Sequence, residues 1–316
     1  GNETASEKPL MRQFMLESGN LANLCADRGW TLQADALRSD LTRPLRPGAA
    51  ELLHAQYTDL AAAPAHYDMV FITNPTSLHA EALRQVKGRG EALFIEKPIF
   101  SAEQTGLALD ELLPAGQKAY VAAPMRWCGA MLALKDRLPA LHPYCARVIC
   151  SSYLPDWRPG VDYRTVYSAR KALGGGVTID LIHEWDYLVE LFGVPEKLYN
   201  FKGTYSELEI DSDDLSVYIA KYPTLLAEVH LDYFGRGYRR SIELFCRDGS
   251  YLADFGKGTL TLPDGTVQHY EEDVNRRYER EMEYFVDYAL TGCGESCNPP
   301  ALALKVLKLT LGENVQ

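Results

Sequence analysis

Short hydrophobic runs alternate with stretches of helical periodicity over the first 122 residues. Four runs predict strands, and three stretches with apolar residues three and four positions apart predict helices. The strands are Trp30–Arg38, Met69–Thr73, Ala92–Ile95 and Lys118–Ala122, and the helices are Ala49–Leu60, Ser77–Lys87 and Ala102–Leu113. Alternating strands and helices predict a parallel sheet with right-handed crossovers. We therefore expect residues 1–122 to form an α/β, Rossmann-type nucleotide-binding domain.

From residue 145 onwards the pattern changes to short alternating segments between turn residues. Eight segments predict strands, and Asp248-Gly249 and Asp264-Gly265 predict hairpin turns. The strands are Arg147–Tyr153, Lys197–Tyr205, Leu215–Lys221, Leu226–Tyr233, Ser241–Cys246, Gly249–Phe255, Thr259–Leu262 and Thr266–Tyr270. Residues 123–316 are thus expected to form an α+β domain around a large, open antiparallel sheet. Late helices near Asp273–Tyr288 and Pro300–Gly312 are expected to pack back on the N-terminal domain.

Composition narrows the class of protein. The chain has 316 residues, enough for two domains, and a formal net charge of −11. That charge argues against nucleic acid and anionic membrane surfaces as partners, because both select basic patches. No apolar run approaches the ~18 residues of a membrane span. The first ten residues lack the apolar core of a signal peptide, so we expect a cytoplasmic protein.

The seven cysteines are odd in number and scattered, which argues against a disulfide framework. Cys293 and Cys297 are spaced like half of a metal site, but no second pair accompanies them. The sequence therefore predicts no metal site.

Two segments carry the candidate chemistry. The strand ending in Phe94-Ile95-Glu96-Lys97-Pro98 places a lysine after a buried run, and Gly174–Asp186 begins with three glycines and continues as a helix. Spacings of three place Asp180, His183 and Asp186 near one face of that helix. A lysine and a histidine of this kind are suited to proton transfer at a carbon that bears oxygen.

Together these segments resemble the glucose-fructose oxidoreductase / inositol dehydrogenase family of NAD(P)-dependent sugar oxidoreductases. Glu96-Lys97-Pro98 matches the family's Glu-Lys-Pro signature, and Gly174–Asp186 is similar to its Gly-Gly…Asp-x-x-His-x-x-Asp helix. Phe71–His79 resembles a strand that ends in Thr-Pro-Asn-x-x-His, with Asn and Pro reordered. The resemblance spans roughly residues 30–290.

The resemblance implies a nicotinamide dinucleotide at the carboxyl edge of the first sheet. It places the backbone after Thr73, Asn74 and Pro75 over the nicotinamide, and Glu96 and Lys97 beside its ribose. Asn74 and His79 fit this edge as further cofactor contacts. The alternative is that Asn74-Pro75 is only a turn before a helix.

The phosphate-binding loop is the weak part of the cofactor site. The segment before Trp30 contains a single glycine, Gly19, and no Gly-x-Gly-x-x-Gly. Either the loop is degenerate, or residues are missing between Leu16 and Leu21; the second interpretation is favoured. Arg38-Ser39, at the end of the second strand, suits a 2′-phosphate, so NADP is weakly favoured over NAD, unless Arg38 is simply solvated.

His183 is the candidate general base, and Lys97 is expected to polarise the substrate hydroxyl. Asp180 is expected to orient the imidazole or to bind a neighbouring hydroxyl. Asp186 either shares in this site or forms a structural pair. The resemblance implies substrate and acid/base residues at these helix positions, and Gly174–Gly176 permits close approach of the backbone to a ligand.

The segment from Tyr153 to Tyr167 is rich in aromatic and arginine side chains, which stack on sugar rings and bind carboxylates or phosphates. It is expected to be a substrate loop, resembling a branch of the family found with surface-sugar biosynthesis; alternatively, it packs on the sheet. The substrate candidates are Trp157, Arg158, Tyr163, Tyr167, Asp180, His183 and, after the Lys118–Ala122 strand, Arg126.

These features favour hydride transfer between a nicotinamide and a secondary alcohol or ketone of a sugar, sugar acid or nucleotide-activated sugar. Two alternatives stay open: a non-catalytic regulator that binds dinucleotide or sugar, and a lyase or glycosidase that uses NAD as a redox relay. The later sheet is expected to expose Val217, Ile219, Val229 and Leu231, which predicts homodimers or homotetramers.

Overall fold

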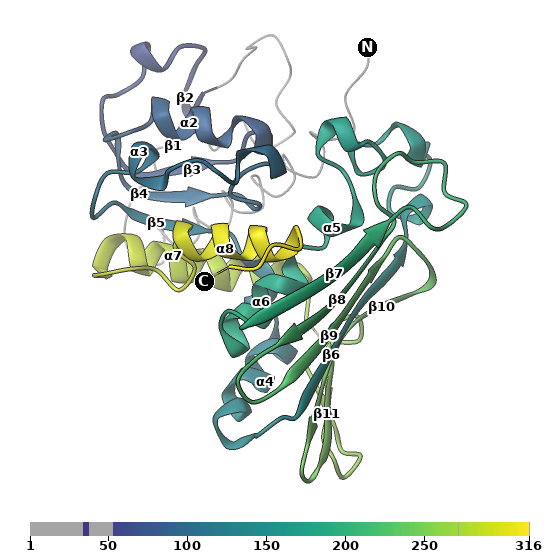
Figure 1. Cartoon of the computed structure of the whole chain (residues 1–316). Coiled ribbons are helices and arrows are strands. Elements are labelled where there is room, and N and C mark those ends of the chain that lie inside the picture. Colours follow the sequence, from purple (N-terminus) through teal and green to yellow (C-terminus); the bar gives the residue numbers. More distant parts are fainter. Residues whose placement is uncertain (1–33, 38–52, 271, 316) are drawn as a thin grey trace.

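The computed structural model describes residues 34–37, 53–270 and 272–315. The glycine-poor segment around Gly19, and Arg38 and Ser39, lie outside the described residues. Figure 1 shows the parallel strands of the N-terminal part at the upper left and a large sheet at the lower right, with helices between them.

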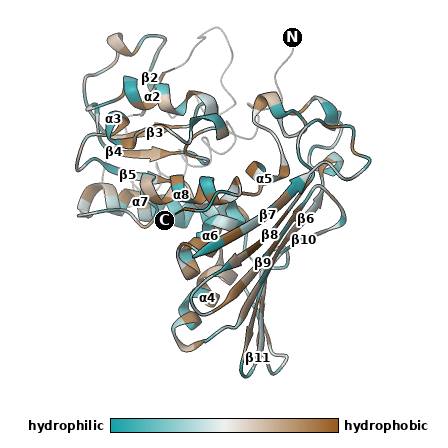
Figure 2. Ribbon diagram, viewed as in Figure 1, coloured by the Kyte–Doolittle hydropathy of each residue, from teal (hydrophilic) through white to brown (hydrophobic). Residues whose placement is uncertain are grey.

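The N-terminal part contains parallel strands, as predicted. Strands β1 (Ala34–Leu37) and β2 (Leu53–Tyr57) pair with each other. Strands β3 (Tyr67–Ile72), β4 (Gly90–Ile95) and β5 (Lys118–Val121) form a second parallel set in the order β3-β4-β5. Figure 2 shows hydrophobic residues concentrated along β3 and β4, as expected for strands covered on both faces.

The expected helix over Ala49–Leu60 is wrong for residues 53–57, which form β2. Exposure alternates along these five residues, which is the period of a strand, and parallel pairing with β1 decided the outcome over local helical spacing. The expected helix over Ala102–Leu113 is interrupted around Gly106, and only its ends, η4 and α3, are helical.

The α-helices of this part are α2 (His79–Gln85) and α3 (Leu109–Leu112). Short 3-10 helices are frequent throughout the described chain. They are η2 (Leu60–Ala62), η3 (Thr76–Leu78), η4 (Ala102–Gln104), η5 (Pro124–Trp127), η6 (Leu138–Ala140), η7 (Leu154–Asp156), η8 (Tyr163–Thr165), η9 (Tyr167–Ala169) and η10 (Lys171–Leu173).

The second sheet has eight strands in the order β13-β12-β11-β10-β6-β9-β8-β7. They are β6 (Cys145–Tyr153), β7 (Lys197–Gly203), β8 (Leu215–Lys221), β9 (Leu226–Asp232), β10 (Phe234–Cys246), β11 (Gly249–Asp254), β12 (Thr259–Thr261) and β13 (Val267–His269). The sheet is mixed, because β6 and β9 are parallel; every other pair is antiparallel, as expected.

Helices cover one face of this sheet (Figure 1). Between β6 and β7 lie α5 (Val177–Asp180) and α6 (His183–Phe192), so the single helix expected there is interrupted at Leu181 and Ile182. Helix α4 (Gly129–Arg137) lies on the same side of the sheet (Figure 1). Val229 and Leu231, expected to be exposed, are buried, because alternation along β9 points them inward.

The two late helices, α7 (Asn275–Thr291) and α8 (Pro300–Thr310), lie beside β4 and β5 (Figure 1). Phe285 of α7 makes edge-on ring contacts with Phe71 and Phe94, at centroid distances of 5.4 and 5.2 Å. Met282 and Val286 are fully buried in the same cluster. The last part of the chain thus completes the hydrophobic core of the first.

Candidate active site

The ends of three parallel strands are held in register at one edge of the N-terminal sheet. The Glu96 amide donates to the Ile72 carbonyl at 2.9 Å, and the Ala122 amide donates to the Ile95 carbonyl at 2.8 Å. Glu96 is buried and accepts from the Lys97 amide at 3.2 Å. The peptide bond between Lys97 and Pro98 is cis. Lys97 therefore leaves the strand at a fixed point of the carboxyl edge.

The Lys97 ammonium lies among charged groups from both domains. Burial lowers its pKa, and the carboxylates of Asp180, Glu96 and Glu184 partly oppose that effect. The strand end and α5 therefore lie within electrostatic range of each other, which relates the two segments singled out in the sequence. A lysine with a lowered pKa exchanges a proton more readily near neutral pH.

His183 begins α6 and lies within electrostatic range of Lys97. Burial, then the positive charges of Lys97, Arg240 and Arg277, hold the pKa of its imidazole well below the usual value. The ring is therefore neutral at pH 7, which is the state that accepts a proton.

Asp180 is held by two tyrosines. Its Oδ2 accepts from the Tyr233 hydroxyl at 2.6 Å, and the Tyr167 hydroxyl bonds to the same carboxylate. Burial and the Asp180 charge raise the pKa values of both tyrosines well above the usual range, so both remain protonated donors. The carboxylate is thus fixed in place by its neighbours in the C-terminal domain.

The glycines before α5 have a packing role in the structure. A Cβ on Gly175 would collide with the Tyr167 carbonyl, and one on Gly176 would collide with the Asp213 carboxylate. Asp213 in turn accepts from the Thr178 amide at 2.9 Å. Glycine is therefore required at these two positions because other groups of the protein lie close to the backbone there.

A buried ion pair lies behind the histidine. Arg240 of β10 binds Glu184 through two bonds, Nε to Oε1 at 2.7 Å and Nη2 to Oε2 at 3.1 Å. The Glu184 side chain is fully buried, so the pair anchors the first turn of α6 to the sheet. The sequence analysis missed both residues, although Glu184 is adjacent to His183.

Arg126 does not occupy the place expected of a substrate contact. Its guanidinium is 3% exposed and binds Asp186 through Nε and Nη2, at 2.9 and 2.7 Å. It also donates to Glu190 at 2.6 Å and to the Asn298 side chain at 3.0 Å. These partners use its donors, so Arg126 and Asp186 form a structural network that joins α6 to η5.

His79 is likewise engaged by the protein. Its Nδ1 lies 3.1 Å from the Ile99 carbonyl and its Nε2 lies 2.9 Å from the Asn74 carbonyl, with 1% of the residue exposed. The ring ties the turn after β3 to the turn after β4 and is not free to contact a cofactor directly. The buried Oδ1 of Asn74 has no hydrogen-bond partner among the described residues, which leaves an acceptor at the edge where a dinucleotide would lie. Thr73 and Pro75 flank it.

The expected substrate loop is ordered by its own contacts. Trp157 donates to the Ser152 hydroxyl at 3.0 Å and lies edge-on to the Tyr233 ring at 5.2 Å. Tyr163 accepts from the Glu209 amide at 3.1 Å, and Arg158 lies over the Tyr167 ring at 5.5 Å.

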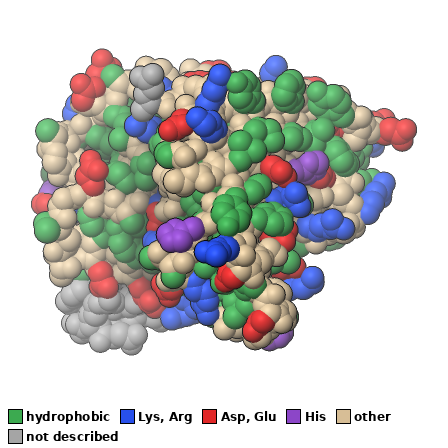
Figure 3. Space-filling model, turned by 60° about the horizontal axis from the view of Figure 1, so that its bottom comes forward, with side chains coloured by type: hydrophobic (Ala, Val, Ile, Leu, Met, Phe, Trp, Pro, Cys, Tyr) green, Lys and Arg blue, Asp and Glu red, His purple; other side chains and the backbone are tan. Residues whose placement is uncertain are grey.

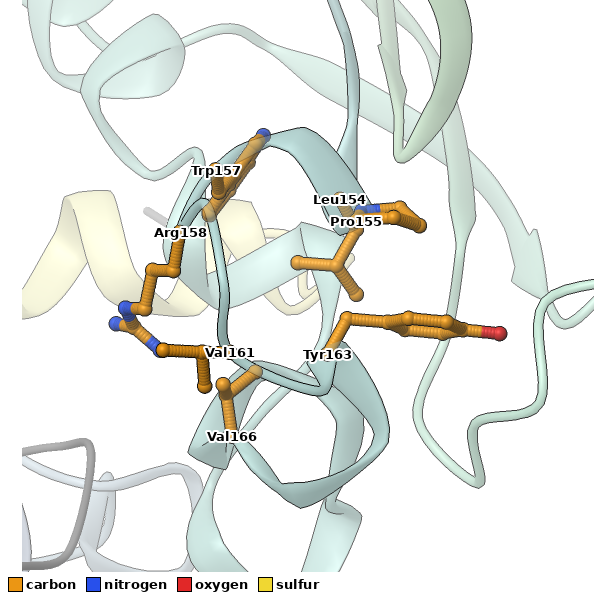
Figure 4. A pocket seen from close by; sticks show the side chains of 7 residues that line it. All are labelled: Leu154, Pro155, Trp157, Arg158, Val161, Tyr163 and Val166. Carbon is orange, nitrogen blue, oxygen red and sulfur yellow. The ribbon is translucent and has the colours of Figure 1, made fainter.

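Figure 4 shows the small pocket that this loop encloses, with Arg158 and Tyr163 pointing in opposite directions. The space inside does not admit a water molecule. Tyr167 of this loop therefore lies near Asp180, and Trp157 packs on Tyr233, which binds Asp180. Trp157 and Tyr163 support the fold of the loop.

The surface has no dominant sign of charge on the face drawn in Figure 3, where acidic, basic and hydrophobic side chains are interspersed. Among the described residues, no helix is long and apolar enough to cross a membrane.

Comparison with known proteins identifies the N-terminal part. Residues 20–122 match the oxidoreductase family with an NAD-binding Rossmann fold (GFO_IDH_MocA). No curated protein matches the chain.

Several solved structures share the fold over nearly the whole chain. An oxidoreductase from Agrobacterium radiobacter, in complex with NAD+, L-tartaric acid and magnesium, is 18% identical with a TM-score of 0.75, over 95% of this chain and 92% of that one. Myo-inositol 2-dehydrogenase from Lactobacillus plantarum is 18% identical with a TM-score of 0.71, over 94% and 91%. A levoglucosan dehydrogenase in complex with NADH and levoglucosan is 16% identical with a TM-score of 0.75, over 95% and 93%.

The resemblance inferred from the motifs and the predicted fold class are therefore confirmed. The match to an oxidoreductase family covers residues 20–122, and the likeness over the whole chain is one of fold. Residues 20–122 are thus similar to the NAD-binding Rossmann domains of the oxidoreductase family GFO_IDH_MocA, and the chain as a whole shares its fold with the solved oxidoreductase and dehydrogenase structures named above.

Proposed function

We propose that this protein transfers hydride between a nicotinamide dinucleotide and a secondary alcohol or ketone of a sugar-like substrate. The observation that carries the proposal is the meeting of Lys97, His183 and Asp180. Both proton-carrying residues are partly exposed, and the charge of Lys97 acts on His183 while that of Asp180 acts on Lys97. A base, a cation and a fixed carboxylate at one sheet edge are the parts needed to oxidise an alcohol.

The described residues fit a dinucleotide at the edge formed by Asn74, Glu96 and Lys97. Asn74 offers an unpartnered acceptor there, and the His79 bridge keeps the two flanking turns in place. When bound, the nicotinamide would supply the hydride acceptor or donor. The predicted preference for NADP over NAD rests only on Arg38 and Ser39.

In the oxidation direction, neutral His183 takes the proton of the substrate hydroxyl. The Lys97 ammonium stabilises negative charge on the same oxygen, which is the charge that grows as the proton leaves. Asp180, fixed by Tyr167 and Tyr233, accepts a hydrogen bond from a neighbouring hydroxyl. The solved relatives bound to levoglucosan and to L-tartaric acid support a polyhydroxylated substrate.

We also propose that a second copy of the chain covers the open face of the large sheet. Tyr199, Phe201 and Ile219 project from adjacent strands of this face and are 53%, 74% and 38% exposed. A groove of about 560 Å³ runs beside them along the same sheet. Exposed aromatic and aliphatic groups on an unpartnered sheet face favour self-association.

The experiment that tests the function is titration of the purified protein with NADPH and with NADH, following nicotinamide fluorescence. Saturable binding of either is expected, with NADPH bound more tightly. A screen of sugars, sugar acids and nucleotide-activated sugars then uses Lys97→Ala and His183→Ala as inactive controls. Absence of binding to both dinucleotides would contradict the proposal and favour a non-catalytic role.

A further inference from the structure

A guanidinium at the start of α7 has no carboxylate partner among the residues that the structure describes. Arg277 lies in the first turn of α7, where its Nη1 donates to the Met125 sulfur at 2.9 Å and its Nε donates to the Val274 carbonyl at 3.2 Å. Among the described residues, no carboxylate lies within ion-pair distance of it. Its neighbours differ: Arg276 pairs with Glu279 at 2.9 Å, and Arg280 pairs with Glu272 at 2.7 Å.

The packing of α7 places Arg277 beside η5, the short helix on which α6 also packs. Met125 belongs to η5, which directly follows β5, and both α6 and α7 pack on this short helix. One turn after Arg277, the buried Glu281 accepts from the Tyr120 hydroxyl at 2.7 Å and from the Ala123 amide. These bonds fix α7 against the carboxyl end of β5, next to the strand that delivers Lys97.

The charge of Arg277 acts on His183, as does that of Lys97 and Arg240. The other two cations have acidic neighbours, because Arg240 binds Glu184 and Lys97 lies near Asp180 and Glu96. Arg277 is the member of this set that is left uncompensated within the described chain. A half-buried guanidinium offers a planar fork of donors that matches a carboxylate or phosphate.

We propose that Arg277 binds an anionic group of the substrate, a carboxylate or a phosphate, so that the enzyme acts on an acidic sugar derivative in preference to a neutral sugar. This inference rests on the proposed function and narrows its substrate class. The bound anion would also offset the positive charge that Arg277 exerts on His183, and so make the imidazole a stronger base when the acidic substrate is present. A phosphate of the dinucleotide would bind Arg277 through the same contacts, and the experiment distinguishes a substrate anion from a cofactor phosphate.

The test compares L-tartrate with L-threitol, which has the same four-carbon skeleton but no carboxylates. Each is titrated by calorimetry into NADH-saturated protein without divalent cations. We expect tartrate to bind at least about tenfold more tightly than threitol, as one charge-assisted contact provides. Arg277→Met is expected to lose that preference and Arg277→Lys to retain part of it. Arg276→Met, on the same helical turn, is the matched control and is expected to behave as the wild type.

The proposal is overturned if wild-type protein does not prefer tartrate, or if folded Arg277→Met keeps the preference. It is also overturned if Arg277→Met weakens NADH binding but leaves tartrate binding to the saturated complex unchanged, since the anion would then belong to the cofactor. If wild-type protein binds neither NADH nor NADPH, the proposed function fails. Tartrate titration of the nucleotide-free protein would still decide the role of Arg277.

Discussion

The buried carboxyl of Glu281 gives the protein a pH-dependent stability that one substitution should remove. Burial raises its pKa from 4.5 to about 8, although the Tyr120 hydroxyl and the Ala123 amide both donate to it. Its second oxygen, Oε2, is buried and has no hydrogen-bond partner within the described part of the chain. At neutral pH the folded protein therefore holds a protonated carboxyl there, whereas the unfolded chain holds a carboxylate.

The sign and size of the effect follow from proton linkage. Between pH 4.5 and 8 the folded state binds one more proton than the unfolded state, so the free energy of unfolding falls as the pH rises. The loss is about 1.4 kcal/mol for each pH unit, or about 3 kcal/mol between the unfolded pKa and pH 7. The contribution of Glu281 to the free energy of unfolding is complete below pH 4.5, and it is lost as the pH rises through about 8, the pKa of this carboxyl in the folded protein.

Glu281→Gln keeps the accepting oxygen but cannot ionise. Its melting temperature relative to wild type is expected to rise by roughly 4 °C between pH 5 and pH 7. The assay is calorimetric or circular-dichroism melting at half-unit pH steps. Glu279→Gln, a half-exposed position on the same helix, is the matched control and is expected to follow the wild-type profile. Parallel profiles for wild type and Glu281→Gln would refute the reasoning, because Glu281 would then ionise as an ordinary carboxyl.

Three further results are expected. His183→Ala and Lys97→Met are each expected to lower kcat by roughly 10²–10⁴-fold while dinucleotide binding is kept. In the wild type, the acidic limb of kcat/KM for alcohol oxidation is expected below pH 6.5, because the pKa of the His183 imidazole is lowered. An acidic limb above that value would contradict a neutral imidazole. Arg126→Met is expected to destabilise the fold by about 3–5 kcal/mol in denaturant unfolding, because it leaves the Asp186 carboxylate buried and uncompensated and leaves Glu190 with Lys135 as its ion-pair partner; unchanged stability with a raised KM would restore Arg126 as a substrate contact. Light scattering is expected to find a dimer or tetramer for the wild type and a smaller species for Phe201→Glu, and a wild-type monomer would contradict the proposed use of the open face.

The sequence predicted features that depend on local signals. The predicted strand at Leu215–Lys221 has its observed bounds, because a short run rich in β-branched and aromatic residues lies between turn residues. The Glu-Lys-Pro strand end and the helix with Asp180 and His183 were found because each is a contiguous motif. That these motifs form one site rested on the resemblance and stays a prediction, which the electrostatic influence of Asp180 on Lys97 supports.

Features that depend on pairing between segments far apart in the chain could not be predicted from the sequence. The parallel pairing of β6 with β9, and β2 in place of a helix, are set by neighbouring strands rather than by local periodicity. The partners of Asp180 and Glu184, which are Tyr233 and Arg240, lie more than 50 residues away along the chain. No spacing rule reveals such partners, and the same holds for the ion pair that withdraws Arg126 from the site.

The position of α7 also sets an order of events during synthesis. Tyr120 and Glu281 are bonded across 161 residues, and Phe285 completes the aromatic cluster of β3, β4 and β5. A ribosome that adds about 5–20 residues per second makes this helix roughly 8–30 s after the strands it covers. During that interval the aromatic face of the nascent first domain remains uncovered, and exposed apolar surface of this kind makes a folding chain prone to aggregation until translation passes Thr291.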